Sequence, residues 1–297
     1  LEHLEPAGVH SGDSTAVIPP YSVNEEMLKE VEEKSKKLAL GLNVKGLLNI
    51  QFAIKDEELF ILEANPRASR TMPFVAKVTG NQIIKAGTLL MLGYSIDEVR
   101  NKTKYLSSSS NKVAIKKAIF PWSRFPAEDT MLGPEMKATG EVLGVGKEFG
   151  TALNKAYAAA GVEINNKEKG IFVTLSDSEK PNFIQTVNKY LELGFTLYST
   201  EGTGKFLKTN GIDSVIVGKA DDLGQTSLTI IEDKLVSLVI NTPTYANELS
   251  DGWKIRRLSH ETGVAVVSSV READAFIEAF LNQNLVLDDL EVIQDVS

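Results

Sequence analysis

LLNIQFAIKDEELFILEANPRASR, at residues 47–70, predicts a β-hairpin that leads into two arginines. Residues 47–54 and 59–65 are rich in apolar side chains, as strands are, and the polar residues 55–58 between them are typical of a turn. Successive side chains of a strand point to opposite faces, so the pairing register decides which side chains share a face. The sequence therefore predicts a hairpin with two faces of different chemistry.

A hairpin centred near Glu57 would separate polar from apolar side chains. The polar pairs in that register are Gln51 with Glu63 and Asn49 with Asn65. The apolar pairs are Ile50 with Ala64, Phe52 with Leu62 and Ile54 with Phe60. One face would then be wholly apolar, and a slip by one residue would mix the two faces.

The polar face of this hairpin offers amide and carboxylate oxygens. Gln51, Glu63 and Asn65 are hard oxygen ligands, which suit Mg²⁺ bound together with substrate phosphates. Arg67 and Arg70 follow directly, and a guanidinium group makes bidentate contacts with phosphate or carboxylate. An ordinary hairpin with a solvated polar face has the same spacing, so the spacing alone leaves both interpretations open.

Three stretches resemble the carbamoyl phosphate synthetase large-chain family of ATP-grasp enzymes. They are GVHSGDS at 8–14, ILEANPRASRTMPFVAKVTG at 61–80 and GPEMKATGEVLG at 133–144, in the order found in that family. The resemblance implies ATP and Mg²⁺, or Mn²⁺, as cofactors. The residues implied for nucleotide binding are His10, Ser11, Gln51 and Glu63. Those implied for the metal are Gln51, Glu63 and Asn65, and those implied for catalysis are Arg67 and Arg70.

Composition limits the class of protein. The 297 residues suffice for about two domains, and a net charge of −8 without a dense Lys/Arg stripe argues against a nucleic-acid partner. The absence of cysteine excludes disulfides, thiolate zinc sites and cysteine nucleophiles, and it fits a cytoplasmic protein. No apolar run approaches a membrane span, and no signal peptide opens the chain. Because the first residue is not methionine, we expect a fragment of a longer protein.

From residue 170 onward, short β-rich runs alternate with helical segments. The runs are GIFVTL, FTLYS, SVIV, LVSLVI and VAVVSS. This alternation predicts a parallel sheet covered by helices, with ligands binding beyond the carboxyl ends of the strands. We therefore expect an α/β protein: the C-terminal part of an ATP-grasp domain (α+β) at 1–100, a connector at 101–165 and a five-stranded parallel-sheet domain at 166–297.

Polar loops lie at the expected carboxyl edge of that sheet. STEGTGK at 199–205 brings backbone N–H groups close to a helix start, which favours an anion site. Asn241 and Thr242 follow the fourth run, Lys219 follows the third, and Lys180 begins the helix after the first. Ordinary helix-capping loops use the same residue types, so a phosphate site and a plain loop both remain open.

The last domain resembles the methylglyoxal-synthase-like fold that ends the carbamoyl phosphate synthetase large chain. VINTP, STEGT and KIRRLSHETGV carry this resemblance. In the family this domain binds allosteric effectors, which are nucleotides such as UMP or IMP in many members. The effector-binding residues implied by position are Thr174, Lys180, Thr200, Thr203, Lys219, Asn241 and Thr242.

The resemblance implies a glutamine-hydrolysing carbamoyl phosphate synthetase, which phosphorylates carbamate with ATP under nucleotide control and serves pyrimidine or arginine synthesis. The implied partners are the rest of the large chain and a glutaminase small subunit, and self-association stays open. We expect the fragment to be inactive alone. One alternative is another ATP-grasp ligase, against which GPEMKATGEVLG and the attached α/β domain speak. The other is a catalytic methylglyoxal-synthase-like lyase, whose glycine-rich Asp loop the residues at 221–224 match poorly.

Overall fold

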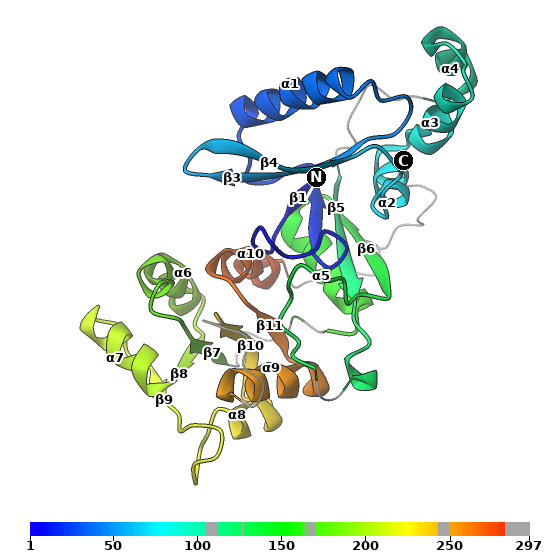
Figure 1. Cartoon of the computed structure of the whole chain (residues 1–297). Helices are drawn as coiled ribbons and strands as arrows, with labels where there is room; N and C mark the ends of the chain where they lie inside the picture. The colour runs from blue at the N-terminus through cyan, green and yellow to red at the C-terminus, as the bar shows by residue number, and fades with distance from the viewer. Residues whose placement is uncertain (105–111, 126–127, 163, 165–169, 243–249, 283–297) are drawn as a thin grey trace. The chain divides into compact units, whose positions relative to one another are not determined.

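The structure is a computed structural model that describes residues 1–104, 112–125, 128–162, 164, 170–242 and 250–282. It forms two compact units (Figure 1). The first holds Leu1–Glu2 and Val17–Ala114, and the second holds His3–Ala16 and the described residues from Ile115 onward. Over the described residues, no helix combines the length and apolar character needed to cross a membrane.

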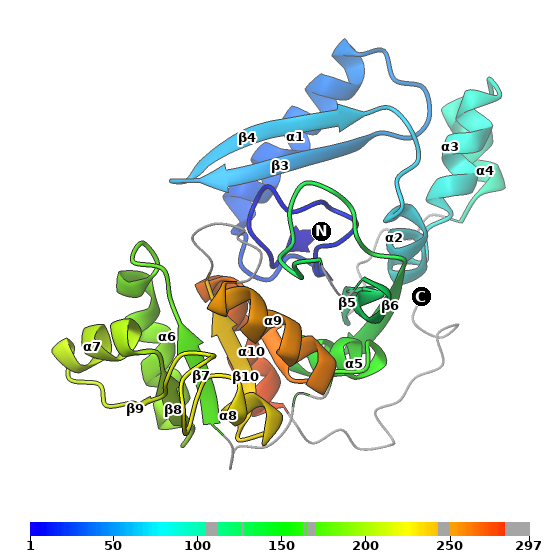
Figure 2. The same ribbon diagram turned by 60° about the horizontal axis from the view of Figure 1, so that its bottom comes forward.

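The first unit is built on a hairpin and four helices. These are β3 (Asn49–Lys55), β4 (Glu58–Asn65), α1 (Glu25–Gly41), α2 (Met72–Thr79), α3 (Ile83–Met91) and α4 (Ile96–Lys102). Asn24 caps α1, because its side chain accepts the Met27 N–H at 2.8 Å. Helix α1 lies along the hairpin, where Lys34 Nζ donates to the Leu59 carbonyl oxygen at 3.1 Å (Figure 2).

The hairpin register is confirmed at one end and wrong at the other. Asn49 pairs with Asn65, Ile50 with Ala64 and Gln51 with Glu63, as expected. The expected pairs of Phe52 with Leu62 and Ile54 with Phe60 do not form. Instead Phe52 pairs with Ile61, Ala53 with Phe60 and Ile54 with Leu59.

A bulge in β4 accounts for this correction. The turn consists of two residues, Asp56 and Glu57, with φ of 51° and 62°, so the hairpin is centred between them. The shift in register between Gln51 and Phe52 then leaves Leu62 as the additional residue of β4. Ile61 and Leu59 therefore take the places of Leu62 and Phe60 opposite Phe52 and Ile54, and Phe60 moves to the face of Gln51 and Glu63. The face that contains Ile50, Phe52 and Ile54 is wholly apolar, as expected, but with different partners from β4.

Glu57→Gly should stabilise this hairpin. A non-glycine residue in the left-handed region costs about 1–2 kcal/mol, part of which glycine removes. We expect the free energy of unfolding to rise by about 0.5–1 kcal/mol in denaturant titrations. Glu58→Gly, one residue later and inside β4, is the control and should lower it. A shift in the same direction for both variants would contradict the turn geometry.

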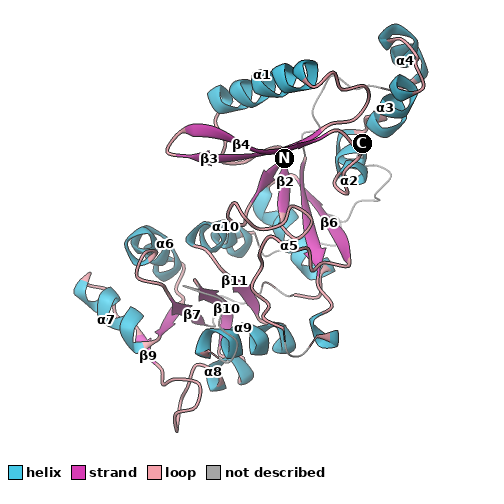
Figure 3. Ribbon diagram, in the orientation of Figure 1, coloured by secondary structure: helices cyan, strands magenta, loops and turns pink. Residues whose placement is uncertain are grey.

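The second unit contains the expected five-stranded parallel sheet (Figure 3). Its strands are β7 (Gly170–Thr174), β8 (Thr196–Ser199), β9 (Val215–Ile216), β10 (Val236–Asn241) and β11 (Ala265–Val267). They lie in the order β11-β10-β7-β8-β9, and each neighbouring pair is parallel. The α/β class and the parallel sheet predicted from alternating runs are confirmed.

Helices cover both faces of this sheet. They are α6 (Lys180–Glu192), α7 (Glu201–Thr209), α8 (Thr229–Glu232), α9 (Asp251–Thr262) and α10 (Val270–Leu281). Figure 1 shows α6 and α10 on one side of the sheet and α8 and α9 on the other. Phe172 of β7 belongs to a buried cluster with Ile230 and Ile255. The ring of Tyr190 lies 6.1 Å from that of Phe280, which joins α6 to α10.

The other elements precede this sheet in the chain. They are β1 (Glu2–His3), β2 (Ala16–Ile18), β5 (Val113–Ile119), the 3₁₀ turn η1 (Trp122–Arg124), β6 (Gly140–Gly146) and α5 (Phe149–Ala159). The four strands form a sheet in the order β1-β2-β5-β6. Helix α5 returns along β6 at short distance, because Gly144 has no side chain to hold it away: a Cβ there would lie 2.1 Å from the Ala152 carbonyl oxygen.

Candidate functional site

The predicted metal ligands lie at the regular end of the hairpin in the first unit. Gln51 and Glu63 are directly opposite each other, and Asn65 lies two residues beyond Glu63 on the same face. Glu63 is exposed, whereas Gln51 and Asn65 are half-buried. One carboxylate and two amide oxygens suit a hard cation that keeps several waters or phosphate oxygens, so the donor set fits Mg²⁺. The described residues contain no group of three or more His, Asp or Glu side chains that could hold a metal ion.

Arg67 and Arg70 lie in the turn that follows β4. The Arg67 backbone N–H donates to the Asn65 carbonyl oxygen at 2.8 Å, and its guanidinium donates to the Ala68 carbonyl oxygen at 3.0 Å. Both arginine side chains are exposed. The hairpin thus carries the oxygen ligands and both cationic side chains within one short segment.

The loop at residues 8–14 in the second unit is held by the segment at 133–144. Asp13 is fully buried, and its carboxylate accepts the backbone N–H groups of Lys137 and Ala138 at 2.8 and 3.0 Å. Two of the stretches that carried the family resemblance therefore contact each other in the fold. Asp13 was not among the predicted site residues, although it lies between the predicted contacts and the strand that follows.

Backbone contacts fix the two predicted nucleotide-binding residues in that loop. The His10 N–H donates to the Gly133 carbonyl oxygen at 2.8 Å, and His10 Nδ1 accepts the Gly12 N–H at 3.0 Å. Because Nδ1 accepts, the proton of the neutral ring is on Nε2, which can donate to a ligand oxygen. The Ser11 carbonyl oxygen accepts from the Lys116 ammonium at 3.1 Å. Since the hairpin and this loop belong to different units, their arrangement as one site stays a prediction.

The carboxyl edge of the five-stranded sheet gathers several hydroxyl groups. The Thr242 N–H donates to the Thr174 carbonyl oxygen at 3.1 Å, which ties β10 to β7. The Thr242 hydroxyl accepts the Ser176 N–H at 2.8 Å, and the Thr200 and Thr203 hydroxyls lie 3.3 Å apart. Each hydroxyl keeps a donor or acceptor for a ligand. The edge thus brings together four of the predicted effector residues, and their effector role stays a prediction.

The two predicted lysines are placed differently. Lys180 Nζ lies 2.5 Å from an Asp177 oxygen at the start of α6, so its charge is already paired. Lys219 is exposed in the loop after β9. Lys205 is the main reason why the pKa of Glu201 is lowered, and Lys219 contributes to that lowering. Lys219 is therefore near the beginning of α7, which follows β8.

Asn241 ends β10 and is hydrogen-bonded to an arginine that was not among the predicted site residues. Arg256 of α9 donates from Nη1 to Asn241 Oδ1 at 2.6 Å. The same guanidinium donates to both carboxylate oxygens of Asp129, at 3.0 Å from Nε and 2.5 Å from Nη2. Asn241 and Arg256 are only 5% and 4% exposed, so this arrangement is protected from water.

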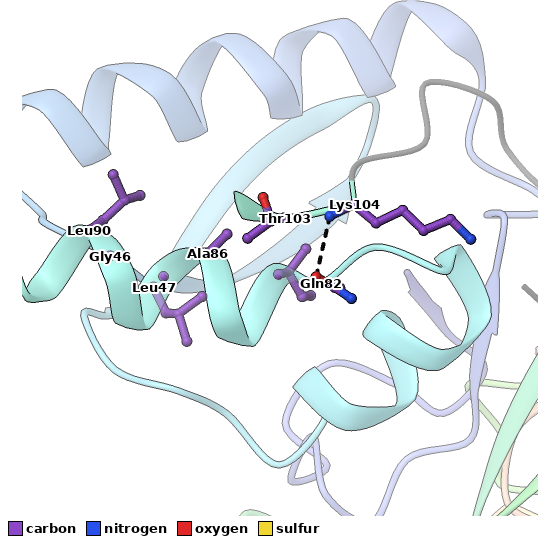
Figure 4. Close-up of a pocket in the computed structure, with 9 residues that line it drawn as sticks. Gly46, Leu47, Gln82, Ala86, Leu90, Thr103 and Lys104 are labelled. Atoms are coloured by element: carbon purple, nitrogen blue, oxygen red, sulfur yellow. Dashed lines mark hydrogen bonds between the residues drawn. The ribbon is translucent and has the colours of Figure 1, made fainter. Parts of the chain in front are cut away.

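A small cavity in the first unit contains none of the predicted site residues. Its volume is about 190 Å³, and it is lined by α3, by Gly46 and Leu47 before β3, and by Thr103 and Lys104 after α4 (Figure 4). Leu47, Ala86 and Leu90 contribute apolar lining, and Gln82 Oε1 accepts the Lys104 N–H at 3.3 Å. Nothing in this mainly apolar lining favours phosphate or a metal.

Two segments of the chain match known protein families. Residues 2–99 match the ATP-binding domain of the carbamoyl-phosphate synthase L chain, and residues 182–268 match the MGS-like domain. The carbamoyl phosphate synthase large chain, C-terminal section, of Aquifex aeolicus is 41% identical over 293 residues, covering 94% of this chain and 54% of that protein. The protein of the same name from Methanocaldococcus jannaschii is 40% identical over 287 residues, covering 94% and 46%.

The large chain of Archaeoglobus fulgidus is 40% identical over 301 residues, covering 100% of this chain and 28% of its own length. The chain belongs to the carbamoyl phosphate synthase large-chain family. It spans about half the length of the Aquifex and Methanocaldococcus relatives. Within this family, the matched ATP-binding segment contains the hairpin and the loop at 8–14.

In this chain, the segment that matches the MGS-like domain contains Asn241 and Arg256 but begins after Thr174 and Lys180. Asp129 lies between the two matched segments. Sequence reasoning missed Asp129 and Arg256 because they are 127 residues apart, and neither stands in a ligand-like cluster. The one available signal for Arg256 was its position in KIRRLSHETGV, a stretch already recognised as similar to the family.

Proposed function

We propose that this chain is the C-terminal section of a carbamoyl phosphate synthase large chain, which uses ATP to phosphorylate carbamate to carbamoyl phosphate. The observation that carries this proposal is the order of two matched domains on one chain: an ATP-binding segment at 2–99 and an MGS-like domain at 182–268. The pairing of Gln51 with Glu63 supports it, because this pairing puts a hard ligand set on one face.

The residues of the hairpin and loop have distinct roles in this proposal. Gln51, Glu63 and Asn65 would hold Mg²⁺, or Mn²⁺, which supplies positive charge to neutralise phosphate oxygens. Arg67 and Arg70 would offset negative charge on the transferring group or the product. His10 would donate from Nε2 to the nucleotide, with Ser11 beside it. Phosphoryl transfer depends mainly on such positioning and charge neutralisation.

The complete enzyme would need more than this chain. We include in the proposal a glutaminase small subunit, the remainder of the large chain, a cytoplasmic location and a role in pyrimidine or arginine synthesis. In the MGS-like domain, the carboxyl edge of the parallel sheet would bind a nucleotide effector such as UMP or IMP. The hydroxyl groups near Thr174 and Thr200, together with exposed Lys219, suit a phosphate-bearing ligand.

The first test is an assay of ADP formation that depends on carbamate. We expect the chain alone to give no activity above background, and co-expression with the remainder of its large chain to give activity. Glu63→Gln in that reconstituted enzyme should lower kcat by at least about 100-fold, because it removes the one charged ligand of the set. Glu58→Gln, on the same strand but at the turn, should leave kcat within about twofold. Steady activity of the chain alone, or full activity of the Glu63 variant, would contradict the proposal.

The second test is calorimetry of the chain with UMP, IMP and inorganic phosphate. We expect at least one nucleotide to bind more tightly than phosphate. The carboxyl edge of the parallel sheet offers more hydrogen-bond donors than a single phosphate group can use. No measurable heat with any of the three would count against the effector role.

A further inference from the structure

The hydrogen bond between Arg256 and Asn241 determines which side of the Asn241 amide can face a ligand. A guanidinium group only donates, so the amide atom that it contacts must be the oxygen Oδ1. Among the described residues, Nδ2 of the same amide has no hydrogen-bond partner. A ligand that contacts Asn241 therefore meets an N–H donor and must offer an acceptor, such as a phosphate or carbonyl oxygen.

Arg256 is itself held by a residue far away in the sequence. The Asp129 carboxylate accepts two bonds from the guanidinium in a bidentate arrangement, and 11% of the Asp129 side chain is exposed. Such a pair in a protected position keeps both side chains in one geometry. Gly252 leaves room for the contact between Arg256 and Asn241, because a Cβ at residue 252 would lie 3.1 Å from Arg256 Nη1 and 3.6 Å from Asn241 Nδ2.

Asp129 also belongs to the segment that holds the loop at 8–14. Its carbonyl oxygen accepts from Lys137 Nζ at 2.9 Å. The backbone N–H of the same Lys137 donates to the buried Asp13 carboxylate at 2.8 Å. Hydrogen bonds, joined by the covalent structure of Asp129 and Lys137, thus connect Asn241 and Arg256 to Asp13 within the second unit.

We propose that Asp129 and Arg256 are positioning residues that couple an acceptor ligand at Asn241 to the loop carrying His10. This inference rests on the proposed function, from which it takes the effector edge and the nucleotide-binding loop. An acceptor bound at Nδ2 favours the amide orientation that Arg256 already stabilises, so ligand binding and the contact between Asp129 and Arg256 strengthen each other. Such coupling is reciprocal: a change at Asp129 alters ligand affinity without touching the ligand.

The chain offers a matched control for the charged pair. Arg257 is the next residue of α9 and donates to Glu261 at 2.7 Å, but its other bonds go to the carbonyl oxygens of Phe125 and Trp122. Asp129→Asn and Glu261→Gln therefore each remove one carboxylate charge from an arginine of the same helix. Only Asp129→Asn changes the partner of the arginine that contacts Asn241.

Calorimetry with UMP, IMP and inorganic phosphate tests the first half of the proposal. Asp129→Asn should weaken the tightest of these ligands roughly tenfold, whereas Glu261→Gln should change its affinity less than about twofold. Arg256→Lys, which keeps the charge but not the bidentate geometry, should lie between them and serves if the Asp129 variant does not fold. Equal affinities for the wild type and the folded variants would overturn the inference.

Hydrogen exchange of the amides at residues 8–14 tests the second half. Saturating ligand should slow exchange of the Asp13 and Ser14 N–H groups, which donate to the His10 carbonyl oxygen, in the wild type and not in Asp129→Asn. Without ligand, Asp129→Asn should exchange faster there than Glu261→Gln. Identical exchange in both variants would overturn the coupling. A wild type that binds none of the three ligands would instead refute the proposed effector function, even if the loop still responds to Asp129→Asn.

Discussion

Lys117→Met is expected to lower the free energy of unfolding by about 3–5 kcal/mol at pH 8, because it leaves a buried carboxylate without its cation. Lys117 lies on β5, with Nζ 3.1 Å from the Thr15 hydroxyl and 3.9 Å from Glu5 Oε1. The Glu5 carboxylate is buried and accepts the Thr15 N–H at 2.6 Å. The same ammonium lies 4.7 Å from the centre of the Tyr157 ring.

The effect of Lys117→Met should depend on pH in a defined direction. Burial raises the pKa of Glu5 to about 7, and Lys117 opposes this rise. A carboxyl group whose folded pKa is raised is favoured in its protonated form, so its contribution to stability decreases as pH rises from the ordinary value of 4.5 to about 7. Without Lys117 the pKa of Glu5 rises further. The variant should therefore lose most stability above pH 7 and less at pH 5, where Glu5 is protonated in the fold.

Denaturant titrations at pH 5 and pH 8 measure this difference. The double variant Glu5→Gln/Lys117→Met removes both charges, and at pH 8 it should be more stable than Lys117→Met alone. An equal loss at both pH values, or a double variant that is no more stable than the single one, would show that Lys117 acts through packing and not through its charge.

Gly144→Ala is expected to destabilise the second unit by roughly 3 kcal/mol or more, because a Cβ there meets backbone atoms that cannot give way. The new atom would lie 2.1 Å from the Ala152 carbonyl oxygen and 2.4 Å from the Ala156 nitrogen, both in α5. Helix α5 would have to move away from β6. Gly140→Ala is the matched control, since it lies on the same strand and the Cβ that alanine adds there would have no atom within 4 Å.

Thermal or denaturant unfolding of both glycine variants is the measurement. Gly140→Ala should change the free energy of unfolding by no more than about 0.5 kcal/mol. If the two alanines have similar effects, the close approach of α5 to β6 does not constrain the fold.

The register of the hairpin could be predicted from the sequence where one face is polar and the other apolar. It could not be predicted near the turn, where apolar residues occur on both faces. Gln51, Glu63 and Asn65 stand out against apolar neighbours, so the register at that end was predictable. The bulge near Leu62 exchanges one apolar residue for another, which leaves no mark on the pattern. Asp56 and Glu57 also lack the glycine that usually indicates a tight two-residue turn.

The carboxyl edge was predictable for a topological reason. Apolar runs rich in β-branched residues indicated the strands, and parallel strands end at one edge, so Thr174 and Asn241 were expected together. The role of Arg256 was not predictable, because the sequence of a charged helix does not distinguish a buried arginine from a solvent-exposed one. Its partner Asp129 is remote in sequence, and only the folded chain brings the two together.

The bulge in β4 has one practical consequence. It separates the hairpin into a ligand end, where Gln51 faces Glu63, and a tip that follows its own register around Asp56 and Glu57. Changes in length at the tip are therefore insulated from the ligand end, because the bulge can absorb a shift in register before it reaches Glu63. The tip is the place to graft a fluorophore or an affinity tag when the occupancy of Glu63 is to be followed without disturbing it.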